Sequence, residues 1–70
     1  MRTESILNKL TEAIKMNNDN ISEVQESVEL LKTKKMEGTA KILELLIKED
    51  KKLSEFLETL KTEILMNIDE

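Results

Sequence analysis

Hydrophobic residues recur every three or four positions in the first half of the chain. This spacing is that of a heptad repeat, in which two positions of every seven form one apolar stripe that faces a partner helix. Asn17 occupies one stripe position as its single polar member. The apolar members are Leu7, Leu10, Ile14, Ile21, Val24, Val28 and Leu31. The pattern predicts a first helix over residues of about 3–36.

The polar segment 17–20 raises the alternative of a break in this helix. Asn and Asp side chains compete with the backbone for hydrogen bonds and favour helix caps. Asn20 with Glu23 three residues later would form a capping box for a new helix, which would give a three-helix arrangement. The heptad phase, however, is kept across this segment, and a turn would give no reason to preserve it. The sequence therefore favours one continuous helix.

A reversal of the chain is predicted where the heptad pattern fails, at residues of about 36–39. Gly38 is the single glycine and can adopt the left-handed conformation that ends a helix, and Thr39 can cap the next helix. A second stripe follows, with Asp50 and Asn67 as polar members. Its apolar members are Leu43, Leu46, Leu53, Leu57, Leu60 and Ile64. This stripe predicts a second helix over about 39–68.

The two stripes match each other as an antiparallel pair. In a hairpin, the position numbers of facing residues add to a constant. A constant of 74 pairs every stripe residue with another stripe residue, for example Val28 with Leu46, and its midpoint lies beside Gly38. The predicted fold is therefore all-α, an antiparallel two-helix hairpin that resembles a coiled coil and forms one domain over residues 1–70.

The composition agrees with long helices and removes most chemistry. The 70 residues include no proline, cysteine, histidine, tryptophan or tyrosine, and 37% of them are charged. Without thiols or imidazoles the chain has none of the usual zinc or haem ligands and no base with a pKa near neutral. The sequence also contains no phosphate-binding loop and no nucleophile motif. We therefore expect no enzyme activity, no cofactor and no metal.

The charge balance limits the expected partners. Eleven basic and fifteen acidic residues give a net charge of −4, which repels nucleic acid. The longest apolar cluster, at 42–47, contains a glutamate and is too short for a membrane span or a signal peptide. We expect a soluble, cytoplasmic protein that binds neither nucleic acid nor a membrane.

The second helix has more hydrophobic residues than its stripe uses. A two-helix hairpin of this length buries little apolar surface, and such small folds usually need a disulfide, a metal or a partner chain. We therefore expect self-association, most simply two hairpins in a four-helix bundle, or a complex with another protein. The predicted partner or oligomer interface consists of Ile42, Leu45, Ile47, Phe56 and Ile68.

Two polar stripe positions and a group of lysines are the remaining candidate sites. Asn17 and Asp50 would fix the register of the helices or line a polar site between them. Lys48, Lys51 and Lys52 would form a candidate anion or nucleotide site if an oligomer brought them together. Both groups have a simpler interpretation, as register-fixing breaks and as solvated charges.

A regulator or inhibitor that occupies the surface of a partner protein is the function that these features favour. The chain lacks chemistry of its own but has an apolar surface to cover, and Phe56 is the expected anchor. A structural assembly element and a binder of a small anionic ligand are the two alternatives.

Overall fold

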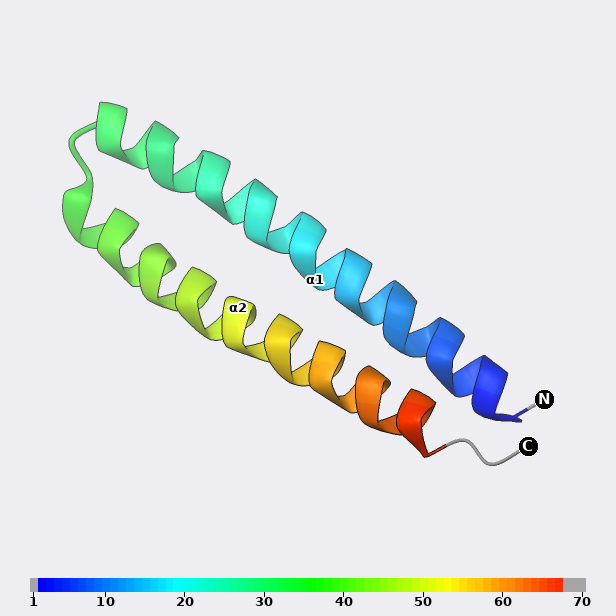
Figure 1. The fold of residues 1–70 in the computed structure, drawn as a ribbon. Helices are drawn as coiled ribbons and strands as arrows, with labels where there is room; N and C mark the ends of the chain where they lie inside the picture. The colour runs from blue at the N-terminus through cyan, green and yellow to red at the C-terminus, as the bar shows by residue number, and fades with distance from the viewer. Residues whose placement is uncertain (1, 68–70) are drawn as a thin grey trace.

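Two antiparallel helices make up the structure, a computed structural model that describes residues 2–67. Helix α1 (Arg2–Thr33) and helix α2 (Glu37–Met66) lie side by side, with the start of α1 and the end of α2 at the end opposite the turn (Figure 1). The predicted all-α hairpin is confirmed. Helix α1 continues through 17–20, so the three-helix alternative is wrong.

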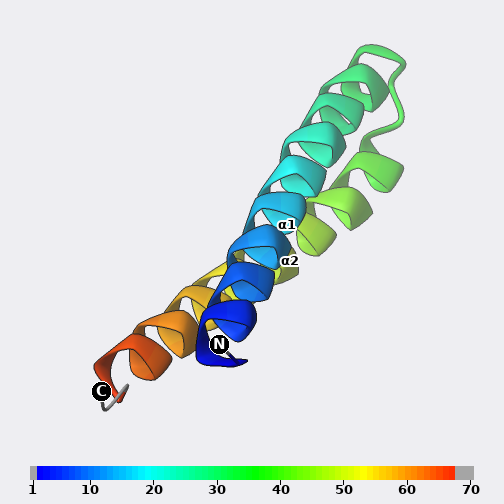
Figure 2. The same ribbon diagram turned by 90° about the vertical axis from the view of Figure 1, so that its right-hand side faces the viewer.

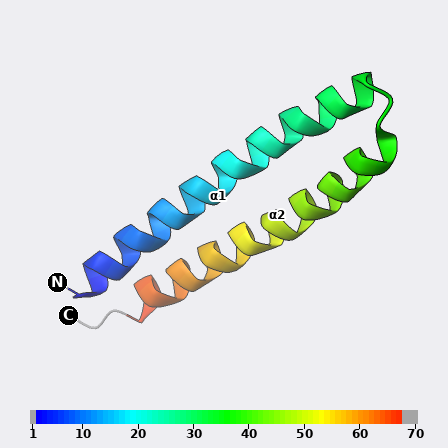
Figure 3. The same ribbon diagram turned by 180° about the vertical axis from the view of Figure 1, so that it is seen from behind.

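The hairpin is a thin rod. Its principal extents are 56 × 15 × 10 Å and its radius of gyration is 16.2 Å, whereas a compact chain of this length has about 11 Å. The helices cross in the view of Figure 2 and run alongside each other again in the view from behind (Figure 3). Because only two helices pack together, each can bury only one stripe of its surface.

The turn at residues 34–36 is closed by backbone hydrogen bonds. The Met36 N–H donates to the Leu31 carbonyl at 2.9 Å, and the Lys35 N–H donates to the Lys32 carbonyl at 3.1 Å. These two bonds form a Schellman motif, which requires a left-handed residue after the helix. Lys35 supplies it with a φ of 60°. The turn after α1 is therefore closed by a lysine in a conformation that glycine adopts more readily.

Gly38 takes no part in the reversal. It lies in the first turn of α2 without a positive φ. Thr39, which the sequence favoured as a cap, also lies inside α2, and Met36 holds the N-cap position without a side-chain hydrogen bond. The reversal thus comes two to three residues earlier than the sequence indicated, because the Schellman motif already closes at Lys35.

The earlier turn changes the side of α2 that faces α1. Asn17 of α1 contacts Ser54 of α2 at 2.8 Å, so the position numbers of facing residues add to 71 rather than 74. A shift of three residues rotates α2 by about 60°. The expected pairing of Val28 with Leu46 is therefore wrong. The stripe of α2 that faces α1 is Ala40, Leu43, Ile47, Asp50, Ser54, Leu57, Lys61 and Ile64, all buried or half-buried.

The core between the helices is small. Its buried residues are 1–8% exposed, and no large side chain among the described residues is less than 2% exposed. Four of the buried residues cluster in the half of the hairpin next to the turn. Ile47 is one of these four, at 8% exposure. The prediction that Ile47 lies at a partner interface is therefore wrong, because the rotation of α2 turns this residue towards α1. The buried members are Ile14, Ile21, Val28, Ala40 and Ile47.

Candidate protein-binding surface

One long side of the hairpin is polar. A surface hollow on this side is lined by charged and amide side chains of both helices around the edges of Val28 and Ile47. A second hollow nearer the chain ends has a similar polar lining. We call this surface the polar side; the charged and amide residues of its first hollow are Gln25, Glu29, Glu44, Lys48 and Lys51.

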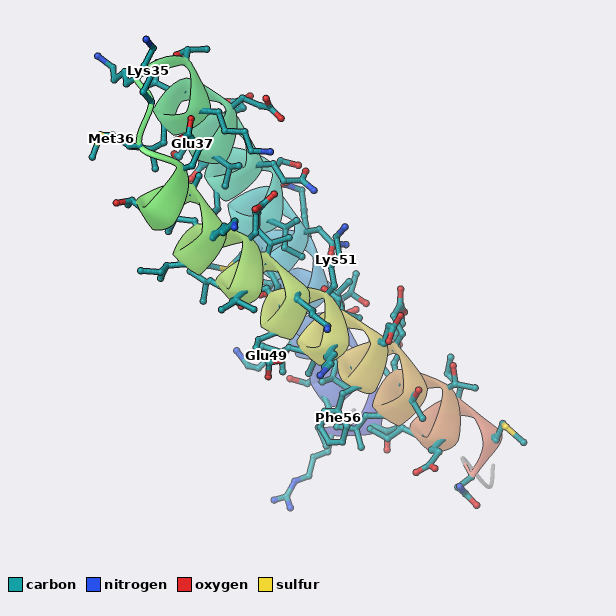
Figure 4. The ribbon with its side chains drawn as sticks, turned by 90° about the vertical axis from the view of Figure 1, so that its left-hand side faces the viewer. Lys35, Met36, Glu37, Glu49, Lys51 and Phe56 are labelled. Carbon is teal, nitrogen blue, oxygen red and sulfur yellow. The ribbon has the colours of Figure 1, made fainter. Side chains whose placement is uncertain are left out.

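The opposite long side carries most of the exposed large hydrophobic residues. Residues three, four or seven apart share one face of a helix, and Figure 4 shows Glu49 and Phe56 extending to one side of α2 and Lys51 to the other. Hydrophobic residues with this spacing follow the Phe56 side of α2 and the matching side of α1. Seven of them are 45–67% exposed and form what we call the apolar side: Ile6, Met16, Leu30, Ile42, Leu46, Leu53 and Phe56.

The residues predicted for a partner interface lie on different surfaces of the hairpin. Ile42 and Phe56 lie on the apolar side, at 67% and 62% exposure. Leu45 is 65% exposed but lies on the outer surface of α2, opposite the stripe that faces α1. Ile68 lies outside the described residues. Leu46 and Leu53 were missed as surface residues because the predicted register placed them between the helices.

Asn17 and Asp50 meet between the helices. The Asn17 side-chain amide donates to the Asp50 backbone carbonyl at 2.7 Å and to the Ser54 hydroxyl oxygen at 2.8 Å. The Ser54 hydroxyl in turn donates to the Asn18 side-chain oxygen at 2.8 Å. Asp50 contributes its backbone to this network, and Ser54, which the sequence did not single out, contributes its side chain. The network thus joins α1 and α2 in the register in which Asn17 faces Ser54.

The three candidate anion-binding lysines do not converge. Lys48 and Lys51 line the hollow on the polar side together with Glu29 and Glu44. Lys52 instead pairs with Glu49 of the same helix at 3.3 Å, and both side chains are well exposed. Both signs of charge therefore mix around these lysines, which does not favour an anion site within one chain.

The described residues offer no other candidate chemistry. Over residues 2–67, no group of three or more acidic side chains is placed to hold a metal ion. Neither of the two helices is long and apolar enough to cross a membrane. Comparisons with protein-family models, curated proteins and solved structures gave no significant match. The apolar side is thus the feature from which a function can be inferred.

Proposed function

We propose that this protein is a non-enzymatic helical interaction protein that binds another polypeptide chain through its apolar side. One observation carries the proposal. Of the eleven exposed large hydrophobic residues in the described part of the chain, seven lie on this one side. Exposed hydrophobic residues that are scattered singly are common, whereas hydrophobic residues gathered on one face usually mark an interaction site.

Phe56 and Ile42 are the proposed anchors of the interface. Aromatic and large aliphatic side chains dominate the centres of protein interfaces, since they bury much apolar area at little entropic cost. Both are more than half exposed, so covering either one would contribute on the order of 1 kcal/mol or more to binding.

Single cysteines can test whether the apolar side is covered, because the chain has none of its own. Leu46→Cys reports on the apolar side, and Leu45→Cys is a matched control one residue away on the outer surface; the two leucines are 48% and 65% exposed. In the cells that make the protein, we expect a thiol reagent to label Leu46→Cys at least about tenfold more slowly than Leu45→Cys. Equal rates would refute the proposal. Labelling after denaturation corrects for intrinsic reactivity.

A further inference from the structure

We propose that the chain covering the apolar side is a second copy of this protein, and that two hairpins form a four-helix bundle in which α2 of each copy packs over α1 of the other. This inference rests on the proposed function and names the partner of the same surface.

The single hairpin exposes more surface than its size requires. Its accessible surface is 5679 Å², whereas a compact monomer of 8.1 kDa exposes about 4,500 Å². The excess of about 1,200 Å² exceeds the roughly 800 Å² that each partner contributes to a stable interface. Because the apolar side runs along a rod 56 Å long, a second rod of equal length is a partner of matching shape.

The register of the hairpin keeps a row of leucines outside. The stripe of α2 that faces α1 includes polar Asp50 and Ser54, while Leu46 and Leu53 stay 48% and 45% exposed. A hairpin with only itself to stabilise would bury the leucines and expose the polar residues. Asn17 and the turn hold it in the other register, which leaves the leucines available to another chain.

On the apolar side, each helix has a row of residues seven apart directly beside the stripe that faces the other helix. The side chains of these two rows differ in size. The row of α2 contains leucines, whereas the row of α1 has smaller or polar side chains between residues 13 and 27; Ile6, the remaining member of the α1 row, lies near the level of Asn67. With facing position numbers adding to 71, each large residue lies within two residues, about 3 Å, of the level of a small one. The three pairs, large residue first, are Leu46 with Ser27, Leu53 with Asn20, and Leu60 with Ala13.

A two-fold axis along the hairpin makes this surface complementary to itself. It places the leucine row of each copy over the small-residue row of the other, at the same levels and with both turns at the same end. The reverse orientation would stack leucine on leucine and leave the small rows facing each other across a gap, which would forfeit packing contacts. The shape of the apolar side therefore favours the two-fold axis along the rod.

Charges on the outer rows of the apolar side suit this arrangement at the open end. Lys9 of α1 and Glu63 of α2 lie at nearly the same level, so the two-fold axis brings Lys9 of each copy near Glu63 of the other. Midway along the rod the same axis brings Glu23 towards Glu49. The Glu49 carboxylate is already paired with Lys52 at 3.3 Å, which offsets this repulsion.

Solution mass tests for the second copy. Sedimentation equilibrium of the full chain should give twice the mass of 8.1 kDa. Leu53→Lys puts a charge on the leucine row, outside the hairpin core, and should weaken dimerisation at least about 100-fold. Leu45→Lys, the matched control on the outer surface, should leave the mass unchanged. Circular dichroism of both variants reports whether the helices persist.

Disulfide formation tests the orientation. When Asn20→Cys chains are mixed and refolded with Leu53→Cys chains, we expect a disulfide between the two variants. Disulfides formed by Leu53→Cys chains alone would overturn the two-fold axis along the rod.

Two outcomes separate this inference from the proposed function. In the first, the chain stays at 8.1 kDa at all concentrations while Leu46→Cys is protected from labelling in cells. This result would overturn the inference that a second copy covers the apolar side, and a foreign protein would be the partner. A single chain whose Leu46→Cys and Leu45→Cys variants label equally fast overturns both proposals.

Discussion

Asn17 is the residue whose side chain joins the two helices by hydrogen bonds, and we infer that it helps to set their register. Its half-buried side-chain amide donates two hydrogen bonds across the hairpin, to the Asp50 carbonyl and the Ser54 hydroxyl. A polar group in such a position costs free energy when its bonds are lost. The register in which facing numbers add to 71 brings Ser54 within reach of this amide, so we expect the polar pair to favour that register over the one that would bury more leucine.

Removing this network should destabilise the hairpin. We expect Asn17→Ala to lower the free energy of unfolding by about 1–2 kcal/mol, and Ser54→Ala by about half as much, since Asn17 keeps its bond to Asp50. Thr11→Ala is the control, because the exposed Thr11 hydroxyl donates to the Leu7 carbonyl of its own helix and Thr11 lies on the polar side; it should change stability by less than about 0.5 kcal/mol. Urea unfolding followed by circular dichroism measures all three, and an Asn17→Ala variant as stable as the parent would contradict the role of Asn17.

Lys35 carries backbone strain that glycine would relieve. A side chain at a φ of 60° costs about 1 kcal/mol. We expect Lys35→Gly to raise the free energy of unfolding by about 0.5–1 kcal/mol, somewhat less than the strain because glycine loses more entropy on folding. Lys34→Gly, at a turn position without a positive φ, should lower stability. The same denaturation experiment decides, and a less stable Lys35→Gly would argue against the Schellman turn.

At the scale of the element, α2 carries two stripes that could each face α1. Both have heptad spacing, and they share Leu43, Asp50, Leu57 and Ile64. The stripe that faces α1 adds smaller and polar residues, and the other adds leucines. If the leucine-rich stripe faced α1, facing position numbers would add to 74. We call this the second register; a turn would be available for it, because Gly38 lies close to its midpoint.

Asn17→Leu should therefore move the hairpin towards the second register. The substitution removes the bonds to Asp50 and Ser54 and would place a leucine opposite Leu57. In that background we expect Ser54→Cys to become labelled by a thiol reagent about tenfold faster, because position 54 rotates out of the contact between the helices. Leu57→Cys, which stays in the contact in either register, is the control and should label slowly throughout. Unchanged labelling at position 54 would show that the turn alone holds the register.

At the scale of the whole molecule, folding and association should be linked. If each hairpin is stabilised by a second copy, the melting temperature rises with protein concentration. Phe56→Ser should lower the melting temperature by about 10 °C and weaken this dependence, from a loss of about 2 kcal/mol. Leu45→Ser, which removes a side chain of similar exposure, should do neither. Thermal melts over a wide concentration range measure both, and a melting temperature independent of concentration would count against the bundle.

The sequence by itself determined that there are two long helices, that they form a hairpin, and which stripe of α1 faces inward. Heptad spacing and the absence of proline are local properties, and they predict the same two helices whichever stripe of α2 faces α1. Ile42 and Phe56 could likewise be identified as surplus hydrophobic residues, because they lie outside both stripes of α2.

Only the tertiary structure decided which stripe of α2 meets α1. Periodicity cannot separate two stripes that share every second member, and the choice depended on a turn closed by a left-handed Lys35 and on the bond between Asn17 and Ser54. Neither feature leaves a repeating pattern in the sequence. A shift of three residues in that turn placed Ile47 inside the hairpin and Leu46 and Leu53 on the apolar side, because in a pair of helices the register sets the rotation of every residue about its axis.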